Sequence, residues 1–268
     1  MQRKDTEKDA KLAGNLEQIR HTLAVISGKG GVGKSTVAAN LATALTRQGY
    51  DVGLLDVDIH GPNIPKLLGV EDVRVSGDED SIIPATTESG LKVMSMAFLL
   101  KDKNLPVIWR GPLKMNVIRQ FLGDVQWGRL DYLIIDLPPG TGDEPLSIAQ
   151  LIPGGHAVVV TTPQDVALLD ARKAVMFAKQ VNMAVLGIIE NMSGFTCPHC
   201  GEPIELFKQG GGRRAAEELD VPFLGAVPLD AAVAASGDAG TPFVGDEASA
   251  AAVAFADIVE RIDQAMGD

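Results

Sequence analysis

A glycine-rich stretch near the amino terminus, Gly28–Ser35, limits what this chain can fold into more than any other feature. Its sequence is GKGGVGKS, and it lies between an apolar, β-branched run at 22–27 and a helix-forming segment that opens at Thr36. Glycines at this spacing let successive backbone N–H groups turn around a polyphosphate, and the following helix adds the positive end of its dipole. The strand–loop–helix pattern therefore predicts a phosphate-binding loop rather than a hairpin that binds nothing.

The loop also carries the side chains that a nucleoside triphosphate requires. Lys34 can reach the β- and γ-phosphate oxygens, and the Ser35 hydroxyl can bind Mg²⁺. Lys29 is a further cation beyond the general pattern. We predict that ATP and Mg²⁺ bind here, with further contacts from Gly28, Gly30, Gly31, Val32, Gly33 and Thr36.

The composition predicts an aliphatic core, because apolar residues make up 46% of the chain and aromatic residues only 4%. Strands that are buried on both faces of a parallel sheet have this character. Predicted strands and helices alternate, which indicates βαβ units. The predicted class is α/β: a P-loop NTPase fold with a mostly parallel central sheet and helices on both faces. Strands are predicted at 22–27, 52–57, around 82–97, 132–137, 157–162, 184–190 and 223–228, and helices at 34–47, 112–122, 143–151, 165–179, 210–219 and 246–265.

The chain is predicted to form one large domain. Residues 1–20 are a polar lead-in, predicted to be partly helical from Asp9 to Arg20, and residues 21–268 form the ATPase domain, with a loop at 195–201 that carries two cysteines. Alanines are dense from Asp230 to Asp257, but Pro242 and a Gly-Asp pair interrupt them. We therefore expect a turn region there, followed by the last helix.

The acidic balance opposes two classes of partner. The net charge is −11 and the sequence pI is about 4.8, so we expect no nucleic-acid or membrane partner. No apolar run approaches the length of a membrane-spanning helix or a signal peptide. Two cysteines three positions apart exclude a disulfide framework and indicate a reducing compartment. The predicted location is the cytoplasm.

Acidic residues follow two of the predicted strands. Asp56 and Asp58 alternate at the end of the strand at 52–57, so both are expected to face the crevice beyond the carboxyl ends of the strands. There they could orient water and hold metal, or simply cap the next turn. Asp136 ends an apolar strand as a Walker B acid does and can reach the Mg²⁺ shell. The loops expected to face the crevice follow Ile26, Val57, Leu137, Thr162 and Glu190.

Cys197 and Cys200 have the spacing that lets two thiolates bind one metal. Two thiolates are half of what a tetrahedral zinc ion or a cubane cluster needs, and His199 between them is badly placed to add to the set. A thioredoxin-like dithiol is the alternative, but that motif should begin a helix near the start of a small domain. A second copy of the chain can supply the missing ligands, so a metal site shared by a homodimer is expected.

The chain as a whole resembles the Mrp/ApbC family of iron–sulfur cluster carrier ATPases, within the deviant P-loop group that includes ParA and MinD. The resemblance covers about residues 20–245. It implies a homodimer that binds a [4Fe–4S] cluster through Cys197 and Cys200 of both subunits and transfers it to apo iron–sulfur proteins, with slow ATP hydrolysis coupled to assembly or transfer. The motifs that carry it are GKGGVGKS (28–35), DVDIHGPN (56–63), RGP (110–112), DLPPGTGD (136–143), TTPQ (161–164) and ENMS with CPHC (190–200).

The same resemblance implies roles for individual residues. Lys29 would cross to the partner's nucleotide, Asp58 would orient the attacking water, and Asp56 would support Mg²⁺ through water. Asn191 would contact the adenine base, together with the segment that begins at Pro228. Two features of some relatives are absent from this sequence: the four-cysteine extension of the eukaryotic scaffold and the small bacterial N-terminal domain.

Two other functional classes share parts of this sequence pattern. A positioning ATPase of the MinD/ParA kind would share the P-loop, and its cysteines could hold a structural zinc at the dimer interface, but residues 246–268 are acidic rather than basic and amphipathic. A nitrogenase-type electron donor takes its ligand cysteines from two separate loops, and this sequence has no others. The choice between iron–sulfur and zinc stays open from the sequence alone.

Overall fold

The computed structural model describes residues 2–59, 61–78, 81–99, 111–197, 199–200, 202–204, 206–246 and 249–267. His60, Arg110 and Pro198, which belong to motifs named above, lie outside these ranges. The strands are β1 (Ile19–Ile26), β2 (Val52–Asp56), β3 (Ser76–Gly77), β4 (Ile82–Ile83), β5 (Ala85–Thr86), β6 (Lys92–Ser95), β7 (Leu130–Asp136), β8 (His156–Thr161), β9 (Ala184–Glu190), β10 (Phe195–Thr196), β11 (Pro203–Ile204) and β12 (Phe223–Ala226). The helices are α1 (Gln2–Leu16), α2 (Lys34–Arg47), α3 (Ile64–Leu67), α4 (Gly111–Gly123), α5 (Asp143–Leu151), α6 (Asp165–Gln180), α7 (Gly211–Leu219), α8 (Ala231–Ala239) and α9 (Ala250–Gly267), with 3-10 turns η1 (Met96–Leu99) and η2 (Phe243–Gly245).

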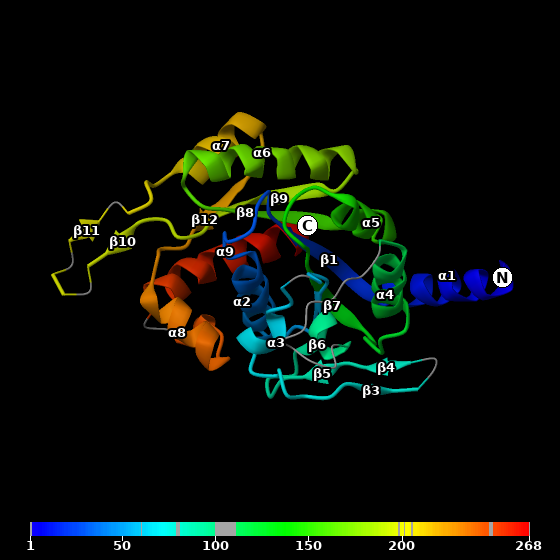
Figure 1. Cartoon of the computed structure of the whole chain (residues 1–268). Coiled ribbons are helices and arrows are strands. Elements are labelled where there is room, and N and C mark those ends of the chain that lie inside the picture. Colours follow the sequence, from blue (N-terminus) through cyan, green and yellow to red (C-terminus); the bar gives the residue numbers. More distant parts are fainter. Residues whose placement is uncertain are drawn as a thin grey trace.

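An eight-stranded sheet forms the centre of the described part, in the order β12-β9-β8-β1-β7-β2-β6-β5. Neighbouring strands are parallel throughout, except that β5 runs antiparallel to β6 at one edge. Helices α4, α5, α6 and α7 cover one face, and α2, α3, α8 and α9 cover the other (Figure 1). The predicted α/β class, with a mostly parallel sheet between two helical layers, is confirmed.

The two helical layers explain why the strands are so apolar. Along β1, Leu23 and Val25 belong to the core beneath α2 and α9, while Ala24 and Ile26 belong to the core on the opposite face. Because successive side chains of a strand point to opposite faces, a strand covered on both sides must be apolar at every position. The carboxyl ends of these strands meet at one edge, where the loops gather.

Most predicted elements are present, with boundaries shifted by a few residues. Helix α2 and strand β9 have the predicted bounds, whereas β1 begins at Ile19, inside the segment predicted as a lead-in. The first helix ends at Leu16 rather than at Arg20. The region around 82–97 is divided among β4, β5, β6 and η1, since the chain reverses direction there to place β5 at the edge of the sheet.

The predicted turn region is present around Pro242, where η2 forms, but it does not begin directly after Asp230. Residues Ala231–Ala239 form helix α8, whose N-cap is Asp230: its Oδ1 accepts a hydrogen bond from the Ala232 N–H at 2.8 Å. The helix ends at Gly240, which has a left-handed backbone conformation. Its residues are half-buried or exposed, so no apolar face marks the helix in the sequence.

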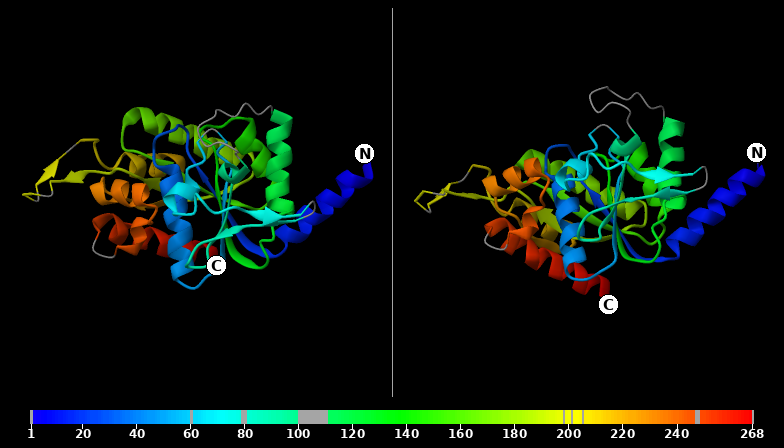
Figure 2. Two further views of the ribbon diagram at one scale, coloured as in Figure 1. Left: turned by 60° about the horizontal axis from the view of Figure 1, so that its bottom comes forward. Right: turned by 90° about the horizontal axis from the view of Figure 1, so that it is seen from below.

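Two parts of the molecule project from this body in opposite directions. The hairpin of β10 and β11 extends away from the sheet on one side, and α1 extends on the other (Figures 1 and 2). The hairpin carries the two cysteines, so the predicted metal-binding loop is an arm rather than part of the core. None of the described helices combines the length and the apolar character needed to cross a bilayer.

Candidate functional site

Close contacts around the loop after β1 explain two of its four glycines. Gly33 has φ of 83°, and a Cβ at this position would lie 2.1 Å from the side-chain nitrogen of Asn191. A Cβ on Gly28 would lie 2.0 Å from the backbone oxygen of Asp170 in α6. Both positions therefore require glycine, one of them for conformation as well as space. The loop is shaped by elements far away in the sequence.

The loop forms one wall of a cleft of about 550 Å³. Four of the five loops expected to face a common crevice line it: those after Ile26, Val57, Leu137 and Glu190. The loop after Thr162 does not, because it turns directly into α6 and packs against Gly211. The lining residues are Ser27, Lys29, Gly30, Gly31, Gly33, Lys34, Ser35, Thr36, Asp58, Asn63, Lys66, Leu67, Pro139, Asn191, Met192, Pro228, Leu229, Asp230, Val233, Ala234, Gly237 and Asp238.

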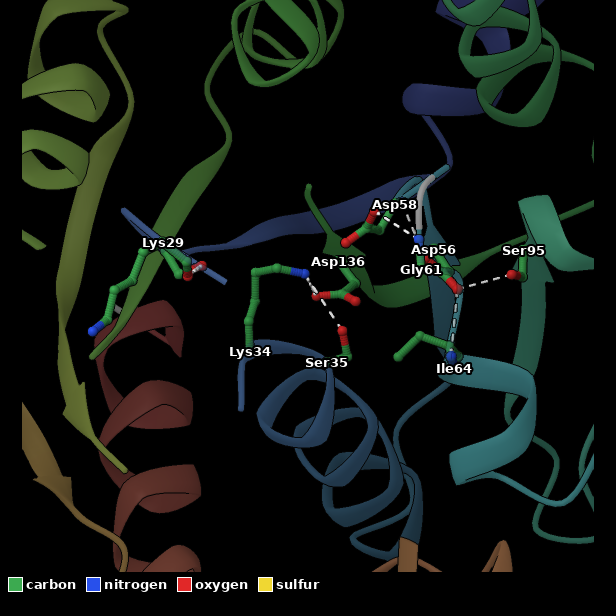
Figure 3. A network of polar contacts seen from close by, with 10 residues as sticks. Lys29, Lys34, Ser35, Asp56, Asp58, Gly61, Ile64, Ser95 and Asp136 are labelled. Carbon is green, nitrogen blue, oxygen red and sulfur yellow. Dashed lines mark hydrogen bonds and ion pairs between the residues drawn. The ribbon is translucent and has the colours of Figure 1, made fainter. Parts of the chain in front are cut away.

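An ion pair lies at the bottom of this cleft. The Nζ atom of Lys34 is 2.6 Å from Oδ1 of Asp136, and both side chains are buried (Figure 3). Burial raises the pKa of Asp136 above its ordinary value, while Lys34 opposes that shift. The second carboxylate oxygen, Oδ2, is buried without a hydrogen-bond partner among the residues that the structure describes. The pair thus brings together the predicted phosphate-binding lysine and the predicted Walker B acid.

Asp56 and Asp58 do not share one surface, contrary to expectation. Asp58 lines the cleft, whereas Asp56 is fully buried and is absent from the lining. The carboxylate of Asp56 accepts hydrogen bonds from the Asp58 N–H at 3.1 Å, the Ser95 hydroxyl at 2.8 Å and the Ile64 N–H at 3.4 Å (Figure 3). Burial raises the pKa of Asp56 well above its ordinary value, and the charge of Asp136 adds to that shift. Asp56 therefore organises the loop that carries Asp58.

The remaining predicted loop residues lie around the same cleft. Lys29 lines it, and its side chain points away from the Lys34–Asp136 pair (Figure 3). The Asn191 amide donates to the Val32 carbonyl oxygen at 2.9 Å, so it braces the loop. Pro228 also lines the cleft. These positions are compatible with the predicted roles, which stay predictions.

Part of the cleft was not anticipated from the sequence. Helix α8 and the short helix α3 with its N-cap residue supply many of the lining residues, including Asn63, Lys66 and Val233. Ser95, which binds the buried Asp56, was also missed. The DVDIHGPN motif could have indicated that residues beyond Gly61 belong to the site, because it extends to Asn63. A lone serine at the end of an apolar strand gives no such indication.

The cysteines lie outside the cleft, on the projecting hairpin. Cys197 is half-buried and Cys200 is exposed. Hydrogen bonds from the backbone N–H groups of His199 and Cys200 lower the pKa of the Cys197 thiol, which favours the thiolate that metals bind. Within the described ranges, no group of three or more His, Cys, Asp or Glu side chains is placed to hold a metal ion. The thiols are therefore an incomplete ligand set in this part of the chain.

Comparison with known proteins adds the family. The sequence matches ParA, described as NUBPL iron-transfer P-loop NTPase, over residues 18–263. The iron-sulfur cluster carrier protein of Methanocaldococcus jannaschii is 52% identical over 257 residues, which cover 96% of this chain and 88% of that protein. The cytosolic Fe-S cluster assembly factor CFD1 of Kluyveromyces lactis is 51% identical over 224 residues, which cover 81% of this chain and 79% of that protein.

Solved structures with the same fold agree with this match. A nucleotide-binding protein from Archaeoglobus fulgidus, in complex with ADP, has a TM-score of 0.77 at 44% identity and covers 87% of this chain and 91% of its own. The cell division ATPase MinD of Pyrococcus furiosus has a TM-score of 0.66 at 25% identity, over 91% of this chain and 99% of its own. The chain belongs to the NUBPL-type iron-transfer P-loop NTPases, within the wider ParA family.

Proposed function

We propose that this protein is an iron–sulfur cluster carrier that binds a four-iron, four-sulfur cluster between two copies of the chain and transfers it to apo-proteins. ATP binding and slow hydrolysis in the cleft are coupled to assembly or transfer. The observation that carries the proposal is the pair of thiols on a projecting hairpin, with no third ligand beside them in the described residues. The names of the Methanocaldococcus jannaschii and Kluyveromyces lactis relatives support the cargo and a cytoplasmic setting.

The ligand count favours a symmetric dimer. A cubane cluster takes four thiolates, and the chain has two cysteines. A two-fold axis through the cluster would supply Cys197 and Cys200 from each subunit, since a symmetric interface presents the same surface twice. Because the hairpin stands away from the sheet, its tip can approach a second copy without displacing core residues.

The residues at the bottom of the cleft fit a magnesium ion. The unpartnered Oδ2 of Asp136 is a hard oxygen donor close to Ser35, and Mg²⁺ prefers such ligands together with phosphate oxygens and water. When bound, the ion would neutralise charge on the phosphates. Lys34 would exchange Asp136 for the β/γ-phosphate oxygens, and Asp58 would orient the attacking water from the cleft wall.

Anaerobic reconstitution followed by size-exclusion chromatography with iron and sulfide analysis tests the cargo. We expect a dimer with about four iron atoms and four sulfides per two chains. Cys197→Ser and Cys200→Ser should each remove the cluster and leave nucleotide affinity unchanged, because neither residue lines the cleft. Thr196→Ala, at an exposed position of the same hairpin, is the matched control and should retain full iron loading.

Two outcomes would contradict this proposal. A monomer that carries a complete cluster would exclude the bridged site. Stoichiometric zinc without sulfide would instead support the alternative, a MinD/ParA-like ATPase with a structural zinc at its dimer interface. Equal rates of cluster transfer with and without ATP would contradict only the proposed coupling to ATP, and the proposal that the protein carries a cluster would stand.

A further inference from the structure

Glu190, at the end of β9, is a buried carboxylate that neither the cleft nor the thiols use directly. Its exposed fraction is 0%. It accepts hydrogen bonds from the Ser193 hydroxyl, from the Gly210 N–H at 2.9 Å and from the Gly212 N–H. A buried carboxylate is costly to desolvate unless donors surround it in this way. Three donors on one carboxylate therefore form a tightly fixed junction.

The three donors lie on both sides of the cysteine hairpin. Ser193 precedes β10, while Gly210 and Gly212 follow β11 and open α7. The start of α7 is crowded against the carboxylate, since a Cβ on Gly212 would lie 2.9 Å from the Cβ of Glu190. Negative charge at the N-terminus of a helix is also favoured by the helix dipole. One side chain thus joins the two ends of the arm that carries the thiols.

The segment that follows Glu190 is also part of the cleft. Asn191 and Met192 line it, and Asn191 donates to the phosphate-binding loop at Val32. Met192 has φ of 55°, an unfavourable conformation for a residue with a side chain, so this turn is held by its surroundings. The cleft wall and the base of the arm are consecutive residues of one strained turn.

A second set of contacts, formed by backbone hydrogen bonds, also connects the cleft wall with the base of the arm. The Ser193 N–H donates to the Val227 carbonyl oxygen at 2.9 Å, and the Leu229 N–H donates to the Gly194 carbonyl oxygen at 2.9 Å. Leu229 lines the cleft and forms a bridge with Phe195, the first residue of β10. Displacement of either wall segment by a nucleotide would therefore reach the base of the hairpin through backbone hydrogen bonds.

We propose that Glu190 is the positioning residue that fixes the cysteine hairpin to the cleft wall, so that nucleotide in the cleft changes how the thiols are presented. This inference rests on the proposed function and gives a structural basis for the coupling between nucleotide and cluster. With the junction intact, the arm moves with the turn at 191–192. With the Glu190 hydrogen bonds broken, the backbone hydrogen bonds with Val227 and Leu229 still hold the base of the arm, but the position of the arm depends less on whether nucleotide occupies the cleft.

Thiol alkylation of the full-length, cluster-free chain tests the connection without any iron. Rates at Cys197 and Cys200 are measured with iodoacetamide, without nucleotide, with MgADP and with a magnesium-bound non-hydrolysable ATP analogue. In the unaltered protein we expect nucleotide to change the rate about fivefold, within the range for linked sites. Glu190→Gln places an amide donor against at least one existing donor, and the nucleotide effect should fall to less than about twofold.

Ser193→Ala is the gentler variant, because it removes only the hydroxyl hydrogen bond between the start of the arm and Glu190. The N–H groups of Gly210 and Gly212 still bind Glu190, and the Ser193 N–H still donates to Val227. This variant should also reduce the nucleotide effect, with the melting temperature and nucleotide Kd unchanged, a combination that a merely structural role would not produce. Ser81→Ala is the control: it removes a serine–carboxylate hydrogen bond of 3.1 Å to Asp78, outside the cleft and the arm. That variant should behave like the unaltered protein.

The inference is overturned if nucleotide leaves the alkylation rates of the unaltered chain unchanged, or if Ser193→Ala keeps the full nucleotide effect. If Glu190→Gln does not fold, Ser193→Ala decides alone. The result is separable from the proposed cargo, because a chain that never binds iron can still show nucleotide-dependent thiols, and a chain that binds a cluster can fail to show them.

Discussion

The nucleotide cleft and the cysteine hairpin differ in how much of each site one chain builds. At the bottom of the cleft, Lys34 and Asp136 are buried and already paired within the described structure, and Asp56 is hydrogen-bonded behind the cleft wall. On the hairpin, two-residue strands hold an exposed Cys200 and a half-buried Cys197. The cleft is organised before its ligand arrives, whereas the arm presents half of a ligand set. Under the proposed function, one chain would bind nucleotide alone, whereas the cluster would need a second copy.

The substitution Lys34→Ala is expected to have the largest effect, and it should affect the cleft but not the hairpin. Charge-assisted hydrogen bonds contribute about 1.5–3 kcal/mol, so loss of the ammonium should weaken nucleotide binding by about 100-fold. Iron loading of the hairpin should persist, because the cysteines lie outside the cleft. Calorimetric titration with MgADP measures the affinity. Lys173→Ala, which removes an exposed ion pair with Asp170, is the control. Undiminished affinity in Lys34→Ala would mean that the loop does not bind phosphate.

A smaller effect, confined to turnover, is expected from Asp58→Asn. The side chain keeps its size but loses the charge that would orient water, so ATP should still bind while hydrolysis slows by at least about tenfold. Phosphate release under single-turnover conditions measures the rate. If hydrolysis continues at the normal rate, Asp58 only caps the turn through its bond with the Gly61 N–H, and another group positions the water.

The smallest effect is expected from Gly33→Ala, with Gly30→Ala as its matched control. An alanine at Gly33 costs about 1 kcal/mol for its left-handed conformation and also meets Asn191. The loop must shift to relieve this, and nucleotide affinity should fall about fivefold. At Gly30, which also lines the cleft, a Cβ meets nothing closer than Pro139 at 3.9 Å, so the affinity should fall less than in Gly33→Ala. Equal effects at the two positions would show that the close contact with Asn191 does not matter.

The phosphate-binding loop, the apolar strands and Asp136 could be predicted because each is written in consecutive residues with a strict pattern. Helix α8 could not, because its alanines are neither buried nor periodic in polarity. The placement of Asp56 away from the cleft depends on Ser95, which is 39 positions distant in the sequence. The junction at Glu190 depends in the same way on the start of α7. Local patterns thus predicted the elements that meet at the cleft, and contacts between distant residues set the orientation of their side chains.

The first helix also has a consequence for how the protein can be shortened. The Asn15 amide donates to the carbonyl oxygens of Leu122, Gly123 and Val125, at 2.9–3.1 Å, where α4 ends. A single side chain from α1 therefore closes the end of a helix more than 100 positions away. The family match starts at residue 18, beyond this asparagine. A shortened chain that begins there would keep every sequence motif but lose the hydrogen bonds from Asn15 to the end of α4. Its melting temperature should therefore fall below that of the full chain.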